Sequence, residues 1–420
     1  MICKQSKSTY LFLFLLMNFQ LISCNKQANS FESKTIVKVQ DTIIKTGAEQ
    51  THLYLKKLMG KNIAIVANQT SVLTVLQRAE VSPNVMGSKK VTHHLVDFLH
   101  NNKKINVQKV FAPEHGFRGK ADAGENVADG IDSKTGLPIL SLHGKHKKPN
   151  QEQLKDIDVV VFDIQDVGVR FYTYISTLHY VMEACAENNI PLIVLDRPNP
   201  NAHYVDGPVL EPKHKSFVGM HSVPVVYGMT IGEYGKMING QKWLKNGLHC
   251  DLTVIPLANY THNSKYSLPI KPSPNLPNDK SINLYPSLGF FEGTTINVGR
   301  GTDFQFQRFG APFFDKTSFS YTPKSNEGAK YPKHKDKLCY GVDLKDTNEL
   351  YKIDLSFLLN AYQQTPKSET FFDKTFTIHA GTEKLQQQIE QGFTESEIRK
   401  SWEKDLEDFK KVRSKYLIYK

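Results

Sequence analysis

The strongest constraint on the fold is a set of short apolar runs that each end abruptly in charged or turn-forming residues. The runs occupy residues 62–67, 107–111, 158–162, 191–195 and 252–255. They are rich in valine, isoleucine and leucine, with no regular polar alternation, which is typical of strands buried on both faces of a parallel sheet. Three of them are followed closely by Glu114, by residues 163–166 and by Asp196–Arg197. In parallel sheets, ligands lie just beyond the carboxyl ends of the strands, so we expect these side chains to meet at one crevice.

Helical patterns separate the runs. Residues 91–101 are expected to form a helix, and residues 174–188 carry an apolar stripe at helical spacing. Thr230 and Glu233 have the spacing of a capping box that opens a further helix, to about residue 239. The alternation of strands and helices predicts right-handed crossovers and an α/β fold with a Rossmann-like parallel sheet.

The composition changes near residue 260, where a proline-rich stretch predicts irregular backbone up to about residue 290. The rest of the chain is expected to form a smaller α/β domain that completes a cleft and ends in helices, one of them opened by a capping box at Thr394 and Glu397. The predicted organisation is a signal peptide at 1–23, a tether at 24–47, a Rossmann-like catalytic domain at 48–260 and a smaller C-terminal α/β domain at 261–420.

The N-terminus has the pattern of an export signal. Lys4 and Lys7 precede an apolar run that is too short to span a bilayer comfortably. The following residues, 21–24, resemble a bacterial lipobox, in which the cysteine is lipidated and becomes the mature N-terminus. We therefore expect lipidation at Cys24 and a lipid anchor to the bacterial envelope, at a periplasmic or outer-membrane face. The alternative is an ordinary cleaved signal in which Cys24 has no role.

Several classes of function lack their signatures. The net charge is +11, but lysine and arginine are spread along the chain, which indicates a lysine-rich surface and no nucleic-acid partner. No glycine pattern for a dinucleotide and no P-loop follows any predicted strand, so no cofactor is expected. The cysteines and histidines show no zinc-binding spacing, so no metal is expected, although distant segments could still assemble a metal site.

Carboxylates carry the predicted chemistry. Two of them facing one sugar are the usual equipment for glycoside hydrolysis, and Glu114, at a strand end before His115 and a glycine, is the best candidate for the acid. Asp163 and Asp166 follow the next strand, and one of them is the candidate second carboxylate. Each of the three could instead be structural, as a hydrogen-bond acceptor or a cap. Weaker candidates are Glu125, Glu292 and Asp303.

Arginines and aromatic residues are the candidate substrate-binding groups. A guanidinium can pair with a carboxylate on an anionic substrate. Salt bridges to nearby aspartates are an equally good interpretation of each arginine, and the aromatic run at 171–174 is more often core than a sugar platform. The predicted substrate-binding residues are His115, Arg170, Tyr172, Arg197 and Arg300.

Long motifs resemble those of one known family. They include FAPEHGFRG, VVVFDIQDVGVRFYTYISTL, DRPNPN, SPNLPN, LYPSLGFFEGT and NVGRGTDFQFQ, and the similarity runs from about residue 47 to the C-terminus. They are similar to the exo-β-N-acetylmuramidase (NamZ-type) family of peptidoglycan hexosaminidases. The resemblance implies a Rossmann-like domain, a smaller C-terminal domain and a catalytic glutamate in the P-E-H-G motif, which is Glu114 here; Asp163, Asp166 and Arg300 are carried over only as motif members.

The implied activity is release of N-acetylmuramic acid from the non-reducing ends of peptidoglycan fragments, in cell-wall turnover. An arginine would suit the lactyl carboxylate of this sugar. The sequence leaves open whether a protein carboxylate, the substrate acetamido group or an inverting water attacks the anomeric carbon. The alternatives from other classes are a non-catalytic surface lipoprotein that binds cell-wall sugars and a metal-dependent hydrolase.

Overall fold

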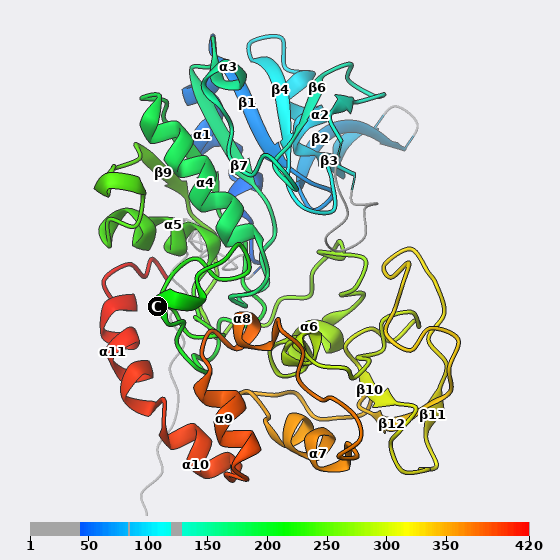
Figure 1. Ribbon diagram of the computed structural model, residues 1–420. Coiled ribbons are helices and arrows are strands. Elements are labelled where there is room, and N and C mark those ends of the chain that lie inside the picture. Colours follow the sequence, from blue (N-terminus) through cyan, green and yellow to red (C-terminus); the bar gives the residue numbers. More distant parts are fainter. Residues whose placement is uncertain (1–42, 83–84, 119–127, 420) are drawn as a thin grey trace, which may run out of the picture. The chain divides into compact units, whose positions relative to one another are not determined.

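A mixed but mostly parallel sheet forms the first half of the protein. The structure, a computed structural model, describes residues 43–82, 85–118 and 128–419. Seven strands pair in the order β5-β6-β4-β1-β7-β8-β9 (Figure 1). They are β1 (Asn62–Ala67), β4 (Asn106–Ala112), β5 (Gly130–Ile131), β6 (Pro138–Ser141), β7 (Val159–Asp163), β8 (Leu192–Leu195) and β9 (Leu252–Ile255). Only β5 pairs antiparallel in this sheet, and the chain runs outward from β1 in both directions, as in a doubly wound Rossmann fold. The predicted α/β class is confirmed.

The apolar runs form strands because both faces of the sheet are covered by helices. Ile65 of β1 lies beside Val110 of β4 and Val161 of β7, and all three side chains are fully buried. Helices α1 (Thr51–Leu58) and α2 (Leu95–His100) pack on one face, and α4 (Tyr174–Glu187) and α5 (Ile231–Gly240) pack on the other (Figure 1). A short helix, α3 (Gln151–Leu154), precedes β7. A sheet covered on both faces has no polar side, which explains the missing alternation.

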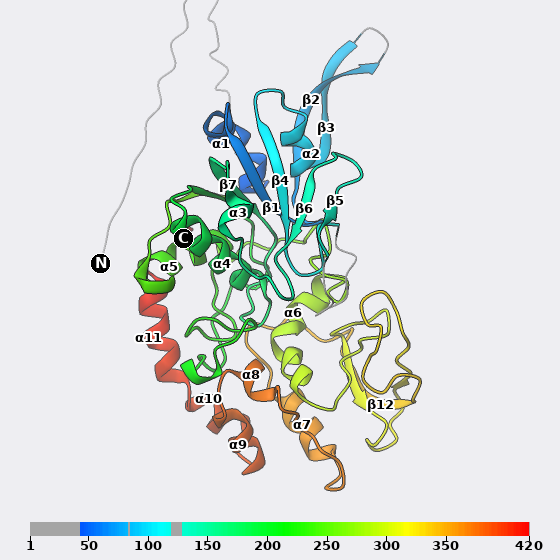
Figure 2. The ribbon, with the colours of Figure 1, turned by 45° about the horizontal axis from the view of Figure 1, so that its top comes forward.

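The second half of the chain adds a smaller α/β region (Figure 2). Its three strands, β10 (Arg308–Ala311), β11 (Ser320–Tyr321) and β12 (Cys339–Asp343), pair antiparallel in the order β10-β12-β11. Its helices are α6 (Asp279–Leu288), α7 (Ser356–Gln364), α8 (Phe376–Ala380), α9 (Lys384–Glu390), α10 (Glu395–Lys400) and α11 (Glu403–Arg413). One apolar core continues from α4 into this region. The division between 48–260 and 261–420 stays a prediction.

The expected helix over residues 91–101 was wrong in its first turn. Residues before Leu95 belong to a two-stranded antiparallel hairpin, β2 (Val72–Ser82) and β3 (Val85–His94), which the sequence analysis missed. In this ribbon the hydroxyls of Thr74 and Thr92 are 3.0 Å apart across the strands. Threonine and valine favour strands, and that preference outweighs the helical spacing of the apolar residues. The helix α2 begins only where His94 caps it, by accepting a hydrogen bond from the Val96 backbone N–H.

The prediction of irregular backbone from residue 260 to 290 was also wrong in part. Helix α6 begins at Asp279 and is capped by Asn278, whose side chain accepts from the Ser281 backbone N–H at 2.9 Å. It contains Pro286 in its interior, which is why the sequence disfavoured a helix. The predicted capping boxes at Thr230 and Thr394 are confirmed. The helix expected after Thr394 is divided into α10 and α11 around Trp402.

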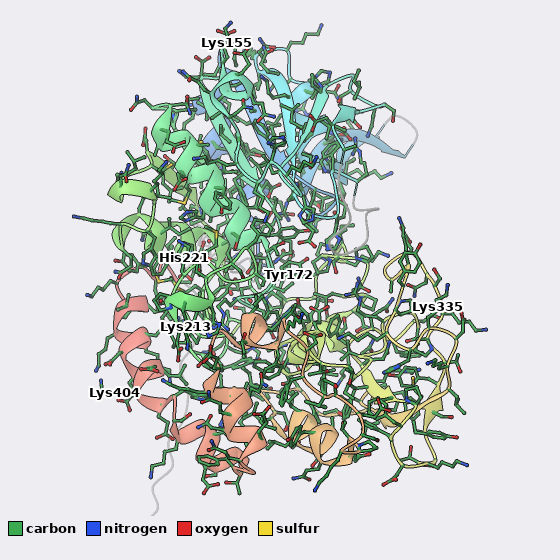
Figure 3. All side chains as sticks on the ribbon, viewed as in Figure 1. Lys155, Tyr172, Lys213, His221, Lys335 and Lys404 are labelled. Carbon is green, nitrogen blue, oxygen red and sulfur yellow. The ribbon has the colours of Figure 1, made fainter. Side chains whose placement is uncertain are left out.

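Exposed lysines carry much of the positive charge. Lys155, Lys213, Lys335 and Lys404 all project from the surface, whereas Tyr172 and His221 lie inside (Figure 3). The labelled lysines are far apart on the ribbon, in agreement with their scatter along the sequence. In the described ranges, every helix is too short or too polar to cross a membrane.

Candidate active site

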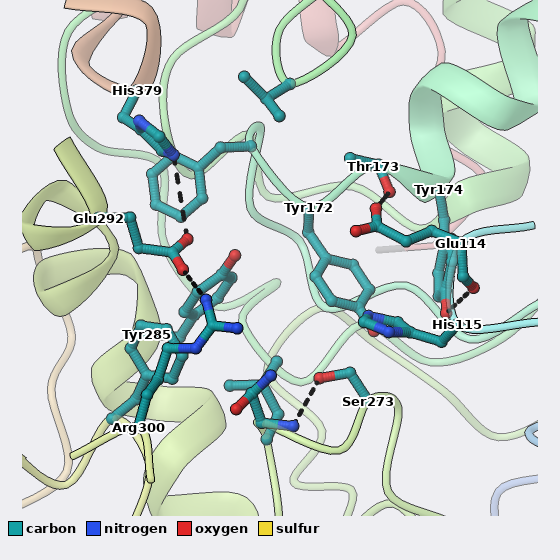
Figure 4. A pocket seen from close by; sticks show the side chains of 15 residues that line it. Glu114, His115, Tyr172, Thr173, Tyr174, Ser273, Tyr285, Glu292, Arg300 and His379 are labelled. Atoms are coloured by element: carbon teal, nitrogen blue, oxygen red, sulfur yellow. Dashed lines mark hydrogen bonds and ion pairs between the residues drawn. The ribbon is translucent and has the colours of Figure 1, made fainter. Parts of the chain in front are cut away.

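A pocket lies beyond the carboxyl end of β4, where loops of the Rossmann-like sheet meet the smaller region (Figure 4). Both parts of the chain contribute to its wall. The chain before α6 supplies Glu114, His115, Phe171, Tyr172, Thr173, Tyr174, Val218, Ser273, Asn275 and Leu276, and the chain from α6 onward supplies Tyr285, Glu292, Arg300, Phe306 and His379. Both chain halves are therefore needed to form this pocket.

Glu114 is held at one wall by an unusual backbone. It follows the last residue of β4 by two positions, and the next two residues, His115 and Gly116, have φ angles of 67° and 75°. Consecutive left-handed residues turn the chain sharply, and a non-glycine residue in this region stores strain of the kind found at functional sites. The Thr173 hydroxyl donates a hydrogen bond of 2.5 Å to the Glu114 carboxylate. His115 is buried and lines the same wall.

A second carboxylate faces Glu114 from the other side of the pocket (Figure 4). It belongs to Glu292, in the 3-10 helix Gly289–Gly293 that follows α6. One of its oxygens lies 3.0 Å from the Arg300 guanidinium, and the other lies 3.9 Å from Nε2 of His379. The Nδ1 atom of His379 is 3.0 Å from the Thr375 carbonyl oxygen, which orients the ring. Glu292 therefore has cationic or titratable partners, and Glu114 accepts a hydrogen bond from a threonine hydroxyl.

Tyrosines form the inner part of the pocket. The rings of Tyr172 and Tyr174 are in edge contact at 4.8 Å, and Tyr285 lies near Tyr172. The Tyr172 hydroxyl donates to the Pro272 carbonyl at 2.9 Å, so this ring is fixed. Burial raises the pKa of Tyr172 and of Tyr285 well above the ordinary value, so both are neutral phenols at physiological pH. They present flat, uncharged faces between the two carboxylates (Figure 4).

Asp163 and Arg197, two of the predicted site residues, are paired with each other. Asp163, at the end of β7, accepts bonds of 2.6 and 2.9 Å from the Arg197 guanidinium, and both side chains are buried. Arg197 also donates to the Val72 carbonyl at 2.9 Å. In the described part of the chain, neither residue lines the pocket. The pair instead joins the carboxyl ends of neighbouring strands, which is the salt-bridge alternative weighed for Arg197.

Asp166 lies deeper, outside the pocket lining as the structure describes it. One of its carboxylate oxygens accepts from the Tyr227 hydroxyl and from the Gly168 backbone N–H, the latter at 2.8 Å. The other oxygen is buried, with no hydrogen-bond partner among the described residues. Burial raises the pKa of Asp166 to about 6, although the hydrogen bonds oppose this shift. Asp166 is thus a buried acid that can hold a proton close to neutral pH.

Arg170 is fully buried and fixes the loop that carries His379. Its guanidinium donates to the Pro208 and Val223 carbonyls at 2.7 and 2.9 Å, and to the His379 and Ala380 carbonyls at 2.9 and 2.8 Å. It is not part of the pocket lining described here. Burial lowers the pKa of Arg170 to about 9, so the side chain remains charged at neutral pH. The geometry gives this arginine a supporting position behind the pocket.

Of the predicted site residues, the structure brings four into the pocket: Glu114, His115, Tyr172 and Arg300. Glu292, a weaker candidate, joins them, whereas Asp303 is exposed and Glu125 lies outside the described residues. Thr173, Asn275 and His379 also line the pocket and were not predicted from the sequence. The first two lie inside quoted motifs and could have been found there. His379 lies in no such motif, and nothing in the sequence singled it out.

The described residues contain no group of three or more histidine, cysteine, aspartate or glutamate side chains placed to hold a metal ion. The pocket instead combines two carboxylates on opposite walls, an arginine and aromatic rings. Paired carboxylates around a sugar-sized site are the equipment of a glycoside hydrolase. The fold and the pocket together therefore define a class, a hydrolase site built at the edge of a Rossmann-like sheet.

Comparison with known proteins identifies the family. Residues 63–280 match the model of the N-terminal domain of exo-beta-N-acetylmuramidase NamZ, and residues 283–419 match the model of its C-terminal domain. The peptidoglycan beta-N-acetylmuramidase NamZ of Bacillus subtilis is 38% identical, over 98% of this chain and all of the relative. The chain belongs to the NamZ family.

Solved structures agree with this assignment. Crystal structures of two DUF1343 family proteins from Bacteroides fragilis are similar to this chain, with TM-scores of 0.79 and 0.72 at 44% and 31% sequence identity. Each similarity covers 90% of this chain and 99% of the other. The family resemblance suggested by the motifs is confirmed.

The raised pKa of Asp166 makes stability depend on pH. Between about pH 4 and pH 6 the folded protein keeps a proton that the unfolded chain has lost, so this group contributes fully to stability below about pH 4, and the contribution is lost as the pH rises through about 6. The variant Asp166→Asn has no ionisable group at this position, so it lacks this pH-dependent contribution to stability. Its unfolding free energy relative to wild type should therefore rise, by on the order of 3 kcal/mol, from pH 4 to pH 7. Urea unfolding at several pH values measures this difference; a difference independent of pH would contradict the assignment.

Proposed function

We propose that this protein is an exo-acting glycoside hydrolase that releases N-acetylmuramic acid from the non-reducing ends of peptidoglycan fragments. Membership of the NamZ family and the activity named for the Bacillus subtilis relative support the reaction. The observation that carries it in this chain is the position of Glu114, at the pocket wall opposite a second carboxylate. We propose no cofactor and no metal for this chemistry.

Glu114 is the general acid of this proposal. Its proton passes to the glycosidic oxygen as the bond from that oxygen to the anomeric carbon breaks, and a water molecule supplies the oxygen and hydrogen that complete the products. The Thr173 hydroxyl, 2.5 Å from the Glu114 carboxylate, stabilises the charge left on the acid after it has given up its proton. His115, on the same wall, contacts the sugar beside the cleaved bond.

In this proposal Glu292 is the second carboxylate, the role that the sequence predicted for Asp163 or Asp166. It lines the pocket, whereas those aspartates are buried against Arg197 and Tyr227. Arg300 and His379 are cationic or titratable neighbours, and they suit Glu292 to act as the charged partner of Glu114. Asp163, Asp166, Arg170 and Arg197 then support the fold and contact no sugar.

Arg300 gives the pocket a preference for an acidic sugar. N-acetylmuramic acid differs from N-acetylglucosamine by a lactyl group that ends in a carboxylate. Arg300 lies on the wall across from Glu114, where it also contacts the Gly328 carbonyl at 3.3 Å (Figure 4). A lactyl group and a glycosidic oxygen leave the ring from different carbons, so a sugar between the walls can present one to Arg300 and the other to Glu114. Tyr172 offers its ring to the sugar face.

Replacing the acid tests the proposed function directly. The variant Glu114→Gln should release N-acetylmuramic acid from a chromogenic muramide or a muramyl disaccharide about 10³-fold more slowly, because an amide cannot supply the proton. Glu152→Gln, an exposed change on α3, is the matched control and should retain full activity. Full activity of Glu114→Gln would remove this residue from the mechanism.

The same assay separates the alternatives. A non-catalytic protein that binds cell-wall sugars would bind the substrate but release no free sugar even as wild type. A metal-dependent hydrolase would lose activity on dialysis against a chelator, whereas the proposed mechanism retains it.

The role of Arg300 predicts a selective loss. Arg300→Met should lower kcat/KM for a muramide by about 10- to 100-fold, the range expected for a hydrogen bond to a charged group. The loss should be clearly smaller on the lactyl methyl ester of the same substrate, because the uncharged ester loses only the support that Arg300 gives to Glu292. Steady-state kinetics with both substrates measure the difference. Equal losses on acid and ester would assign Arg300 to the shape of the pocket only.

We further propose that the protein is an exported lipoprotein that serves cell-wall recycling. The basic and apolar N-terminus and the lipobox-like residues ending at Cys24 support this; they lie outside the described residues. Cys24→Ser should move the protein from the membrane fraction to the soluble fraction of cells and abolish labelling with a radioactive fatty acid. An unchanged distribution and unchanged labelling would leave Cys24 without a role.

A further inference from the structure

Asn275 places an unsatisfied amide in the wall of the pocket. The residue is 5% exposed and lines the pocket, yet neither Nδ2 nor Oδ1 has a hydrogen-bond partner among the described residues. A buried amide without partners is unfavourable by about 1–3 kcal/mol, so such groups are rare in native proteins. In the described ranges, other buried amides lack a partner on one atom only, whereas Asn275 lacks it on both.

The segment around Asn275 holds the amide in place. The Asn275 backbone N–H donates to the Ser273 hydroxyl at 3.1 Å, and prolines precede and follow at positions 274 and 277. The Pro272 carbonyl just before it accepts from Tyr172, so the segment is fixed to the pocket floor. Proline also removes backbone freedom. The segment therefore holds Asn275 at the wall of the pocket.

A glycine next to Asn275 leaves room for this amide. A Cβ atom added at Gly328 would lie 2.9 Å from Oδ1 of Asn275, closer than ordinary contact. The carbonyl of Gly328 accepts from Arg300. The same loop residue therefore contacts the arginine and borders the asparagine, so the two groups stand on neighbouring parts of the wall. Both Arg300 and Asn275 line the pocket, so one ligand in it can contact both.

We propose that Asn275 recognises the 2-acetamido group of the sugar in the pocket. An acetamido group carries one carbonyl acceptor and one N–H donor, and Asn275 offers the complementary donor and acceptor, Nδ2–H and Oδ1. Pairing the two amides satisfies both side-chain atoms of Asn275 that have no partner among the described residues. This inference rests on the proposed function, because it requires an amino sugar at this site, and it adds the residue that selects the acetylated form.

The selectivity follows from the unpaired atoms. A sugar with a free amine could donate a hydrogen bond to Oδ1. The amine carries no carbonyl oxygen, so Nδ2–H would remain without an acceptor. A site built to hydrogen-bond a group rejects an analogue that lacks it, because buried polar atoms are then left without partners. The pocket should therefore prefer N-acetylmuramic acid to muramic acid, in which the acetyl group is absent.

Binding of these two sugars tests the proposal, independently of how the bond is cleaved. The full-length protein is titrated with N-acetylmuramic acid and with muramic acid by calorimetry. Wild type should bind the acetylated sugar at least about 10-fold more tightly. Asn275→Ala should weaken binding of the acetylated sugar by about 10- to 100-fold and change muramic acid by less than about 3-fold, which removes the preference. Asn263→Ala, an exposed asparagine away from the pocket, is the matched control and should behave as wild type.

A second variant covers the case in which Asn275→Ala fails to fold. Gly328→Ala keeps every side chain of the pocket but crowds Oδ1 of Asn275, so it should weaken the acetylated sugar selectively. Equal weakening of both sugars by both folded variants would overturn the proposal and assign Asn275 to pocket shape. If wild type binds neither sugar, the proposed function itself fails, whereas binding of both with equal affinity contradicts only the role of Asn275.

Discussion

The pocket depends on one buried guanidinium. Arg170 has no exposed surface, and its charge is balanced by four backbone carbonyls, two from the loops at residues 208 and 223 and two from residues 379 and 380. A buried charge is tolerated only when hydrogen bonds replace water, so all four carbonyls are held where the guanidinium needs them. The loop that carries His379 is thereby fixed against the Rossmann-like half, and with it the wall that holds Glu292.

Three acidic residues at the carboxyl edge of the sheet have different surroundings and therefore different roles. Glu114 follows β4, and Asp163 and Asp166 lie at the end of β7, two parallel strands on either side of β1, so all three residues come to the carboxyl edge of the sheet. Their surroundings separate them. Asp163 faces a guanidinium and Asp166 a tyrosine, both in the interior, whereas Glu114 faces the pocket beside a threonine. The position at a strand end therefore brings a side chain to the carboxyl edge of the sheet. The hydrogen-bond partners around that side chain then decide whether it can contact a ligand.

Much of this arrangement could be predicted from the sequence, because unalternated apolar runs specify a parallel sheet, and the sheet specifies the edge at which Glu114 lies. Side-chain partners could not be predicted in the same way. Arg170 follows a valine and Arg197 follows an aspartate in the sequence, but their acceptors are between 34 and 210 residues away along the chain. The sequence alone could not show that these contacts bury them. The hairpin at residues 72–94 was missed for a local reason, since its apolar residues also fit helical spacing.

The contacts of Arg170 also order the events of folding. Two of its four acceptors come from residues 379 and 380, so a growing polypeptide that has not yet reached that point would enclose a positive charge with half of its ligands missing. The strands of the Rossmann-like half can pair without this segment, whereas the wall with Glu292 and His379 needs residues from near the end of the chain. A chain truncated before residue 379 is therefore expected to keep its sheet strands but to lack a complete pocket.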